Sequence, residues 1–67
     1  MLQYKVVHVD IGYQYIRYDG QKIDMRGKYE EEIQEEVLNH LAQYGWRLVQ
    51  AVHEKEEEMY LYLERQV

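Results

Sequence analysis

A single amphipathic helical segment lies between two stretches of strand-like alternation, and this arrangement constrains the fold more than any other feature. Apolar residues recur at helical spacing within residues 28–44, on a stripe made of Tyr29, Ile33, Val37, Leu41 and Tyr44 and widened by Leu38. One helix can cover only one face of a sheet. The sequence therefore predicts an α+β fold, in which a small antiparallel sheet carries one amphipathic helix on one face.

The segment before the helix alternates from Gln3 to Tyr18, which is long for one strand. We expect a bulge or bend at Gly12. One face of this strand would carry Val7, Val9, Ile11, Tyr13 and Tyr15, and the other Tyr4, Val6, His8, Gln14, Ile16 and Tyr18. Asp19-Gly20 then predicts a tight turn, with a returning strand over 21–25. Residues 11–26 would thus form a hairpin arm that extends the sheet and reaches a neighbouring subunit.

The segment after the helix predicts two further strands within a single domain, residues 1–67. Gly45 should end the helix in the left-handed conformation, with Trp46 packing back on Leu41. Strands are expected over 47–53 and 58–65, with a charged turn between them. Met59, Leu61 and Leu63 should face the helix. The predicted order is strand–strand–helix–strand–strand, or strand–helix–strand–strand with an inserted hairpin.

Two short motifs resemble a small bacterial and phage family that is known only as a domain of unknown function. They are Tyr4-Lys5-Val6-Val7 near the start and Gly45-Trp46-Arg47-Leu48-Val49 after the helix, and Arg65 matches a basic residue near the end of the family's last strand. The resemblance implies a strand–helix–strand–strand domain. It implies no catalytic residues, and the segment from Ile11 to Gly27 departs from the family's usual pattern.

Charge and composition disfavour several classes of function. The net charge is −5, so nucleic acid is an unlikely partner. The charge is uneven: residues 1–29 carry a net +2, and residues 30–67 a net −7. Without Cys, Ser or Thr, the usual catalytic nucleophiles are absent. No hydrophobic run is long enough to span a membrane and no signal peptide is visible, so we expect a cytoplasmic protein that is not an enzyme.

Two surfaces are candidates for binding. The sheet face away from the helix is expected to form a homodimer or higher oligomer, because Tyr is enriched at interfaces and a small core gains from burial; its residues are Tyr4, Val6, His8, Tyr60 and Tyr62. The hairpin interleaves aromatic and basic side chains that suit a ring and a phosphate, namely Tyr13, Tyr15, Arg17, Tyr18, Lys22 and Arg26. An ordinary edge hairpin, blunted with charge against aggregation, would show the same composition.

These patterns lead to one functional hypothesis and one alternative. We expect a small non-enzymatic, homo-oligomeric binding protein whose site lies between subunits and sequesters a small anionic, nucleotide-like ligand. This expectation uses an analogy, of size and residue type only, with small phage proteins that sequester signalling nucleotides of the host. The alternative is an adaptor or inhibitor that docks through the acidic helix face, which carries Glu31, Glu32, Glu35 and Glu36. No metal site or cofactor is expected, because the three His residues show no paired ligand spacing.

Overall fold

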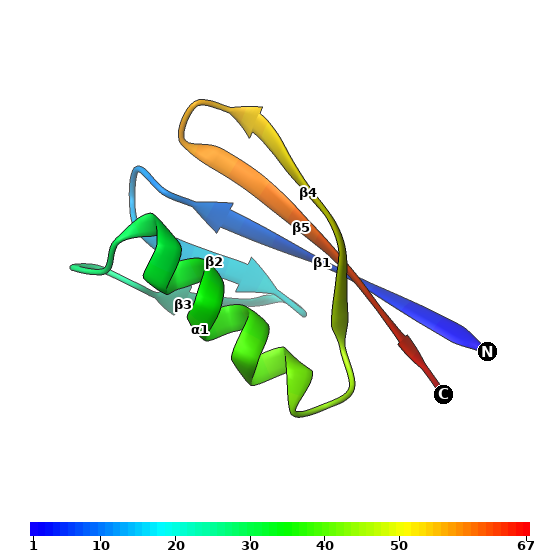
Figure 1. Ribbon diagram of the computed structural model, residues 1–67. Helices are drawn as coiled ribbons and strands as arrows, with labels where there is room; N and C mark the ends of the chain where they lie inside the picture. Colours follow the sequence, from blue (N-terminus) through cyan, green and yellow to red (C-terminus); the bar gives the residue numbers. More distant parts are fainter.

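The computed structural model describes residues 1–67 as one five-stranded antiparallel sheet with a helix packed on one face (Figure 1). The strands follow the order β3-β2-β1-β5-β4. The elements are β1 (Leu2–Asp10), β2 (Tyr15–Tyr18), β3 (Gln21–Asp24), α1 (Glu30–Ala42), β4 (Arg47–Lys55) and β5 (Glu58–Gln66). This architecture confirms the predicted α+β class.

Three strands precede the helix, because the chain reverses where a bend was expected. β1 ends at Asp10, and β2 pairs with it antiparallel from Tyr15 onward. The carboxylate of Asp10 accepts a hydrogen bond of 2.8 Å from the Tyr13 N–H, and Gln14 adopts a φ of 60°. A side-chain cap and a left-handed residue together close a tight loop, whereas a bulge would only kink the strand.

This reversal changes which residues share a face, so the predicted face sets were wrong beyond the turn. Val9 pairs with Ile16, and both side chains are buried. Tyr18 lies on the same buried face, whereas Tyr15 shares the opposite face with His8. The physical reason is the loop between β1 and β2. Side chains alternate between faces only within one strand, so the loop changes which residues of β2 face the helix.

The β2–β3 hairpin belongs to the body of the domain. Asp19 and Gly20 have φ values of 52° and 73°, as the predicted tight turn requires. Ile16, Tyr18 and Met25 are buried in the core. The hairpin therefore extends the sheet, as predicted, but lies in it as two strands under the helix instead of standing off as an arm (Figure 1).

The core lies between α1 and the sheet. Ile33, Val37 and Leu41 form the buried stripe of the helix, and they belong to the same apolar cluster as Val7, Val9, Met59, Leu61 and Leu63. The helix begins two residues later and ends two residues earlier than the predicted 28–44. Its first turn is acidic, which suits the positive end of the helix dipole, and the Tyr29 N–H donates to Glu32 Oε1 at 3.0 Å.

The end of the helix is arranged as predicted. Gly45 adopts a φ of 87° and donates its N–H to the Ala42 carbonyl at 3.0 Å. The Trp46 N–H donates to the Leu41 carbonyl at 3.2 Å, which completes the hydrogen-bond pair of a Schellman motif. Trp46 is thereby buried at the start of β4.

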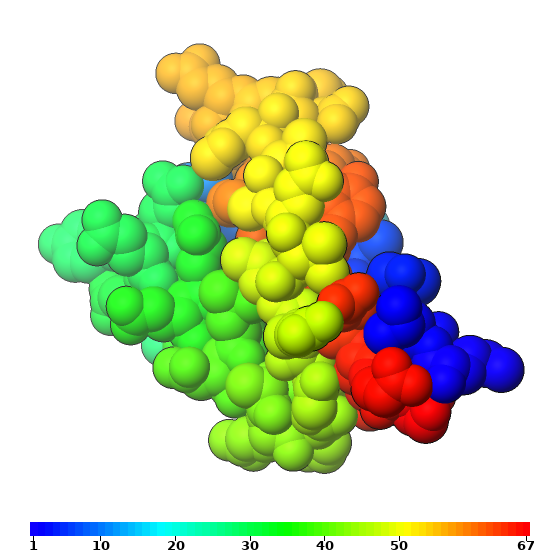
Figure 2. All heavy atoms as spheres, turned by 45° about the vertical axis from the view of Figure 1, so that its right-hand side comes forward, coloured from blue at the N-terminus to red at the C-terminus, as the bar shows by residue number.

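The far edge of the sheet and the two chain ends lie on the surface (Figure 2). β4 is an edge strand, drawn in yellow, and its pairing with β5 is irregular at two places. Such irregularities protect an edge from pairing with another chain. The termini lie side by side, where Met1 and Val67 exchange main-chain hydrogen bonds of 3.1 and 2.9 Å. No helix of the structure is long and apolar enough to span a bilayer.

Candidate binding site on the open sheet face

The sheet face opposite α1 is uncovered, and we call it the open face. It carries the residues that alternate with the buried ones, among them all five that were predicted for an oligomer interface: Tyr4, Val6, His8, Tyr60 and Tyr62. Val6 pairs with Tyr62, and His8 pairs with Tyr60 across the β1–β5 ladder. Tyr4 is 70% exposed, Val6 47% and Tyr62 40%. The centre of the open face is therefore an apolar and aromatic strip in contact with solvent.

His8 connects the aromatic residues of this strip. Its ring stacks on Tyr60, with 5.0 Å between ring centroids, and meets Tyr15 edge to face at 5.8 Å. Its Nε2 atom lies 3.1 Å from Glu58 Oε1. A half-buried imidazole thus sits between two aromatic rings and a carboxylate.

Two cations on β2 and β3 are placed against one tyrosine ring. Lys22 Nζ lies 4.3 Å from the centroid of Tyr15, and Arg17 Cζ lies 5.6 Å from it. Both distances are within the range of cation–π attraction. Neither side chain forms an ion pair with a carboxylate, whereas most other basic residues of the chain do. Their positive charge is therefore available to an anion.

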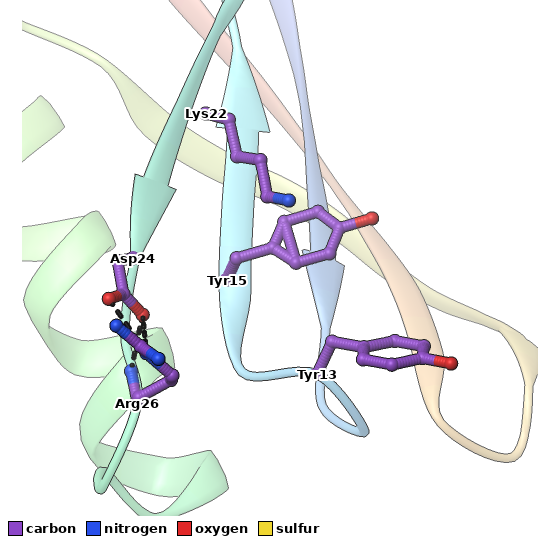
Figure 3. A pocket seen from close by; sticks show the side chains of 5 residues that line it. All are labelled: Tyr13, Tyr15, Lys22, Asp24 and Arg26. Atoms are coloured by element: carbon purple, nitrogen blue, oxygen red, sulfur yellow. Dashed lines mark hydrogen bonds and ion pairs between the residues drawn. The ribbon is translucent and has the colours of Figure 1, made fainter.

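A shallow depression of about 580 Å³ adjoins these cations (Figure 3). Its lining residues come from the β1–β2 loop, β2, β3 and the turn that follows: Tyr13, Tyr15, Lys22, Asp24 and Arg26. Figure 3 shows the Tyr13 and Tyr15 rings extending in the same direction, with Arg26 folded back on Asp24. Arg26 Nε lies 2.9 and 3.2 Å from the two Asp24 oxygens. The Arg26 backbone N–H and then its guanidinium, both hydrogen-bonded to the carboxylate, lower the pKa of Asp24 below its usual 3.8.

The structure brings together most of the residues predicted for ligand binding. Tyr13, Tyr15, Lys22 and Arg26 line the depression, and Arg17 lies beside it on the open face. Tyr18 does not belong with them. It lies on the opposite face with only 7% exposure, where burial raises the pKa of its phenol.

Asp24 was missed by the sequence reading as part of this surface. The signal that could have identified it is its spacing of two from Arg26, within a segment already rich in basic residues. A second group, His8, Asp10 and Glu58, was missed as a set of metal ligands, and its ligand atoms all lie within 4.8 Å of one another. Its signal is the alternate spacing of His8 and Asp10, which places both on one face of a strand.

The acidic helix face is partly neutralised. Lys28 Nζ lies 2.9 Å from Glu36 Oε2, a contact that raises the pKa of the Lys28 ammonium. Glu32 accepts the hydrogen bond from the Tyr29 N–H at the start of the helix. Glu31 and Glu35 form no ion pair, so the acidic surface offered to a partner is smaller than the sequence indicates.

A family model described as a domain of unknown function (DUF4177) matches residues 3–66. The matched range spans the segment between Ile11 and Gly27. No curated protein matches the chain. No solved structure matches it either.

Proposed function

The chain belongs to the DUF4177 family of unknown function, and we propose that it is a non-enzymatic binding module that associates with itself and holds a small nucleotide-like anion. The observation that carries this proposal is the placement of two unpaired cations, Arg17 and Lys22, against the ring of Tyr15. We also propose the cytoplasmic location that the sequence predicts, where such anions are abundant.

The chemistry of the surface suits a flat ring attached to a phosphate. An aromatic ligand can stack on Tyr13 or Tyr15, as bases stack on tyrosine in proteins that bind single strands. A phosphate beside it can pair with Lys22 and with Arg17, whose guanidinium matches two phosphate oxygens at once. Arg26 adds a third cation at the rim, although Asp24 already engages its Nε. Asp24 disfavours a highly charged anion, so a small ligand fits better than a polynucleotide.

Self-association would cover the exposed strip of the open face. We propose that a second copy of the chain covers this strip. Basic and acidic side chains lie on opposite halves of the open face, so two copies can bring opposite charges together. Cations lie on β2 and β3, whereas β5 carries Glu58 and Glu64, which would exchange their present partners Lys55 and Arg47 for the cations of the second copy. Two copies packed face to face about an axis parallel to the strands bring β2 and β3 of one over β5 and β4 of the other. The ligand site would then lie between subunits and include Tyr, Arg and His side chains.

An adaptor that docks through the helix is the second candidate. It is favoured by Glu31 and Glu35, which lie one turn apart and have no basic partner in the chain. An adaptor should tolerate Arg17→Ala and lose its partner when Glu31 and Glu35 are both changed to Lys. The binding module should show the opposite pattern.

Isothermal titration with ADP, adenosine and ribose 5-phosphate tests the proposed ligand class. We expect ADP to bind better than either fragment, because only ADP combines a ring with phosphates. Arg17→Ala and Lys22→Ala should each weaken ADP binding at least tenfold and leave the oligomer intact by light scattering. Lys28→Ala removes a cation that is paired with Glu36 on the helix and does not line the depression, and it serves as the matched control. Equal ADP binding by all four proteins, or none by the wild type, overturns the nucleotide proposal.

A further inference from the structure

We propose that His8, Asp10 and Glu58 form a site for one divalent transition-metal ion at the end of the β1–β5 ladder. The site shares His8 and Glu58 with the face proposed to contact a second copy, but it uses neither Arg17 nor Lys22 of the proposed ligand surface. His8 and Asp10 lie two residues apart on β1, and Glu58 pairs with Asp10 at the start of β5. Three ligands from two adjacent strands are thus held on the open face by the register of the sheet.

The separation of the ligand atoms fits a shared ion. Two atoms that each lie about 2.1 Å from a zinc ion, at angles between octahedral and tetrahedral, are about 3.0–3.4 Å apart. His8 Nε2 and Glu58 Oε1 are 3.1 Å apart. An oxygen of Asp10, a ring nitrogen of His8 and a carboxylate oxygen of Glu58 all lie within 4.8 Å of one another, so the Asp10 oxygen must move closer to share the ion.

The burial of Asp10 is an independent observation that points to a cation. It is the one charged residue of the chain in the buried class, with 7% exposure, and it forms no ion pair. The Tyr13 N–H satisfies one carboxylate oxygen, Oδ1. Across the ladder Asp10 meets Glu58, a second carboxylate. A cation bound between the two carboxylates would neutralise both of them.

The ammonium group of Lys55 is close to this site but does not occupy the position of the metal ion. Lys55 Nζ lies 3.5 Å from Glu58 Oε2, which is the oxygen that does not face His8. The Lys55 side chain is 73% exposed, so this ion pair is weak. A depression of about 420 Å³ leads to the site and is lined by Asp10, Tyr13, Lys55 and Glu56, Glu57 and Glu58. An ion can enter through this acidic depression, and water can complete its coordination.

The donor set selects the class of metal. One imidazole nitrogen and two carboxylate oxygens suit Zn²⁺, Co²⁺, Ni²⁺ or Mn²⁺. Ca²⁺ and Mg²⁺ prefer oxygen ligands alone, and the imidazole of His8 serves them poorly. Three protein ligands leave at least one position for water, so the ion would also be able to accept an anion from solution.

The test uses the full chain freed of metal with EDTA and titrated with Zn²⁺ by calorimetry. We expect one Zn²⁺ per chain and a much weaker response to Mg²⁺. His8→Gln and Glu58→Gln should each weaken Zn²⁺ binding at least tenfold. His53→Gln is the matched control, because His53 lies on the helix side of β4 near Glu30 and should bind as the wild type does.

The Asp10→Asn variant distinguishes the role of Asp10 as a metal ligand from its role in the β1–β2 turn. The Asn side-chain oxygen can still accept the Tyr13 N–H, so the fold should be kept, as circular dichroism will show, while Zn²⁺ binding falls. In a complementary experiment Mn²⁺ should broaden the amide resonances of residues 8, 10 and 58 before others. Wild-type Zn²⁺ affinity in His8→Gln, Glu58→Gln or Asp10→Asn overturns the site, as does the lack of stoichiometric Zn²⁺ binding by the wild type.

Discussion

Arg65 holds its guanidinium carbon 4.4 Å from the centroid of the Trp46 ring, and its Nη1 donates a hydrogen bond of 3.0 Å to the Tyr44 carbonyl. Lys5 approaches the same ring, with its Nζ 4.8 Å from the centroid. These contacts join β1, the end of α1 and the last strand at one point. The residues that carried the family resemblance therefore meet in space, and their arrangement supports the fold at the helix end.

Replacing Arg65 with Gln should weaken this junction. The change removes a cation from a nearly buried indole, a contact worth about 0.5–2 kcal/mol. We expect the free energy of unfolding to fall by about 1 kcal/mol in urea titrations followed by circular dichroism. Arg26→Gln is the control, because Arg26 and its partner Asp24 are both exposed, so the loss of stability should be smaller than in Arg65→Gln. Equal losses in the two variants would contradict the role of the Trp46 contact.

Ile16→Ala tests whether the hairpin belongs to the core. Ile16 is 1% exposed, and truncating a buried Ile to Ala costs about 2–5 kcal/mol. In a domain of this size we expect the variant to be largely unfolded at room temperature, as near-ultraviolet circular dichroism would report. Tyr15→Ala, one residue away on the open face, should remain folded. A stable Ile16→Ala protein would show that the hairpin is dispensable.

The turn at Asp19-Gly20 makes a separate prediction. Gly20 has a φ of 73°, and nothing lies within 4 Å of the position that a Cβ would occupy. A residue substituted here would therefore be restricted by its backbone conformation and not by its neighbours. Gly20→Ala should lower the free energy of unfolding by about 1 kcal/mol, because L-residues other than Asn and Asp disfavour this left-handed conformation. Gly20→Asn should cost less than Gly20→Ala in the same urea titration. The reverse order would contradict the left-handed turn.

The Asp24 carboxylate should titrate below its ordinary pKa of 3.8, because the Arg26 backbone N–H and guanidinium hydrogen-bond to its charged form. A lowered folded-state pKa contributes stability above the unfolded pKa, and that contribution disappears as the pH falls through the folded pKa. Arg26→Gln keeps the backbone bond, so the pKa should rise only part of the way to 3.8. Carbon NMR of the side-chain carboxyl measures it. A full return in Arg26→Gln would assign the whole shift to the guanidinium.

Local signals in the sequence predicted most of the elements of the fold. The helix stripe, the Asp19-Gly20 turn and the Gly45-Trp46 helix end each depend on neighbouring residues, and each was found where expected. The reversal after Asp10 was not predicted, because it depends on a side-chain cap and on the left-handed Gln14, neither of which has a specific sequence pattern. Because of this loop, Ile16 and Tyr15 lie on the faces opposite to those predicted, since side chains alternate every residue along a strand.

The candidate site was predicted in part for the same reason. Residues whose faces depend only on their own strand, such as Tyr60 and Tyr62, were placed correctly on the open face. Tyr18 was misplaced because its face depends on the loop before β2. The cluster of His8, Asp10 and Glu58 depends on the pairing of β1 with β5, distant in the chain, and such a register cannot be read from spacing along one strand.

Native mass spectrometry of protein purified without denaturation tests the central claim most directly, because it reports subunit number and retained ligand together. The denatured mass of the same sample is the reference. We predict a discrete oligomer that carries a few hundred extra daltons per site, in keeping with a nucleotide-sized anion, and that loses this mass in Arg17→Ala. A monomer without added mass would contradict both the association through the open face and the shared ligand site.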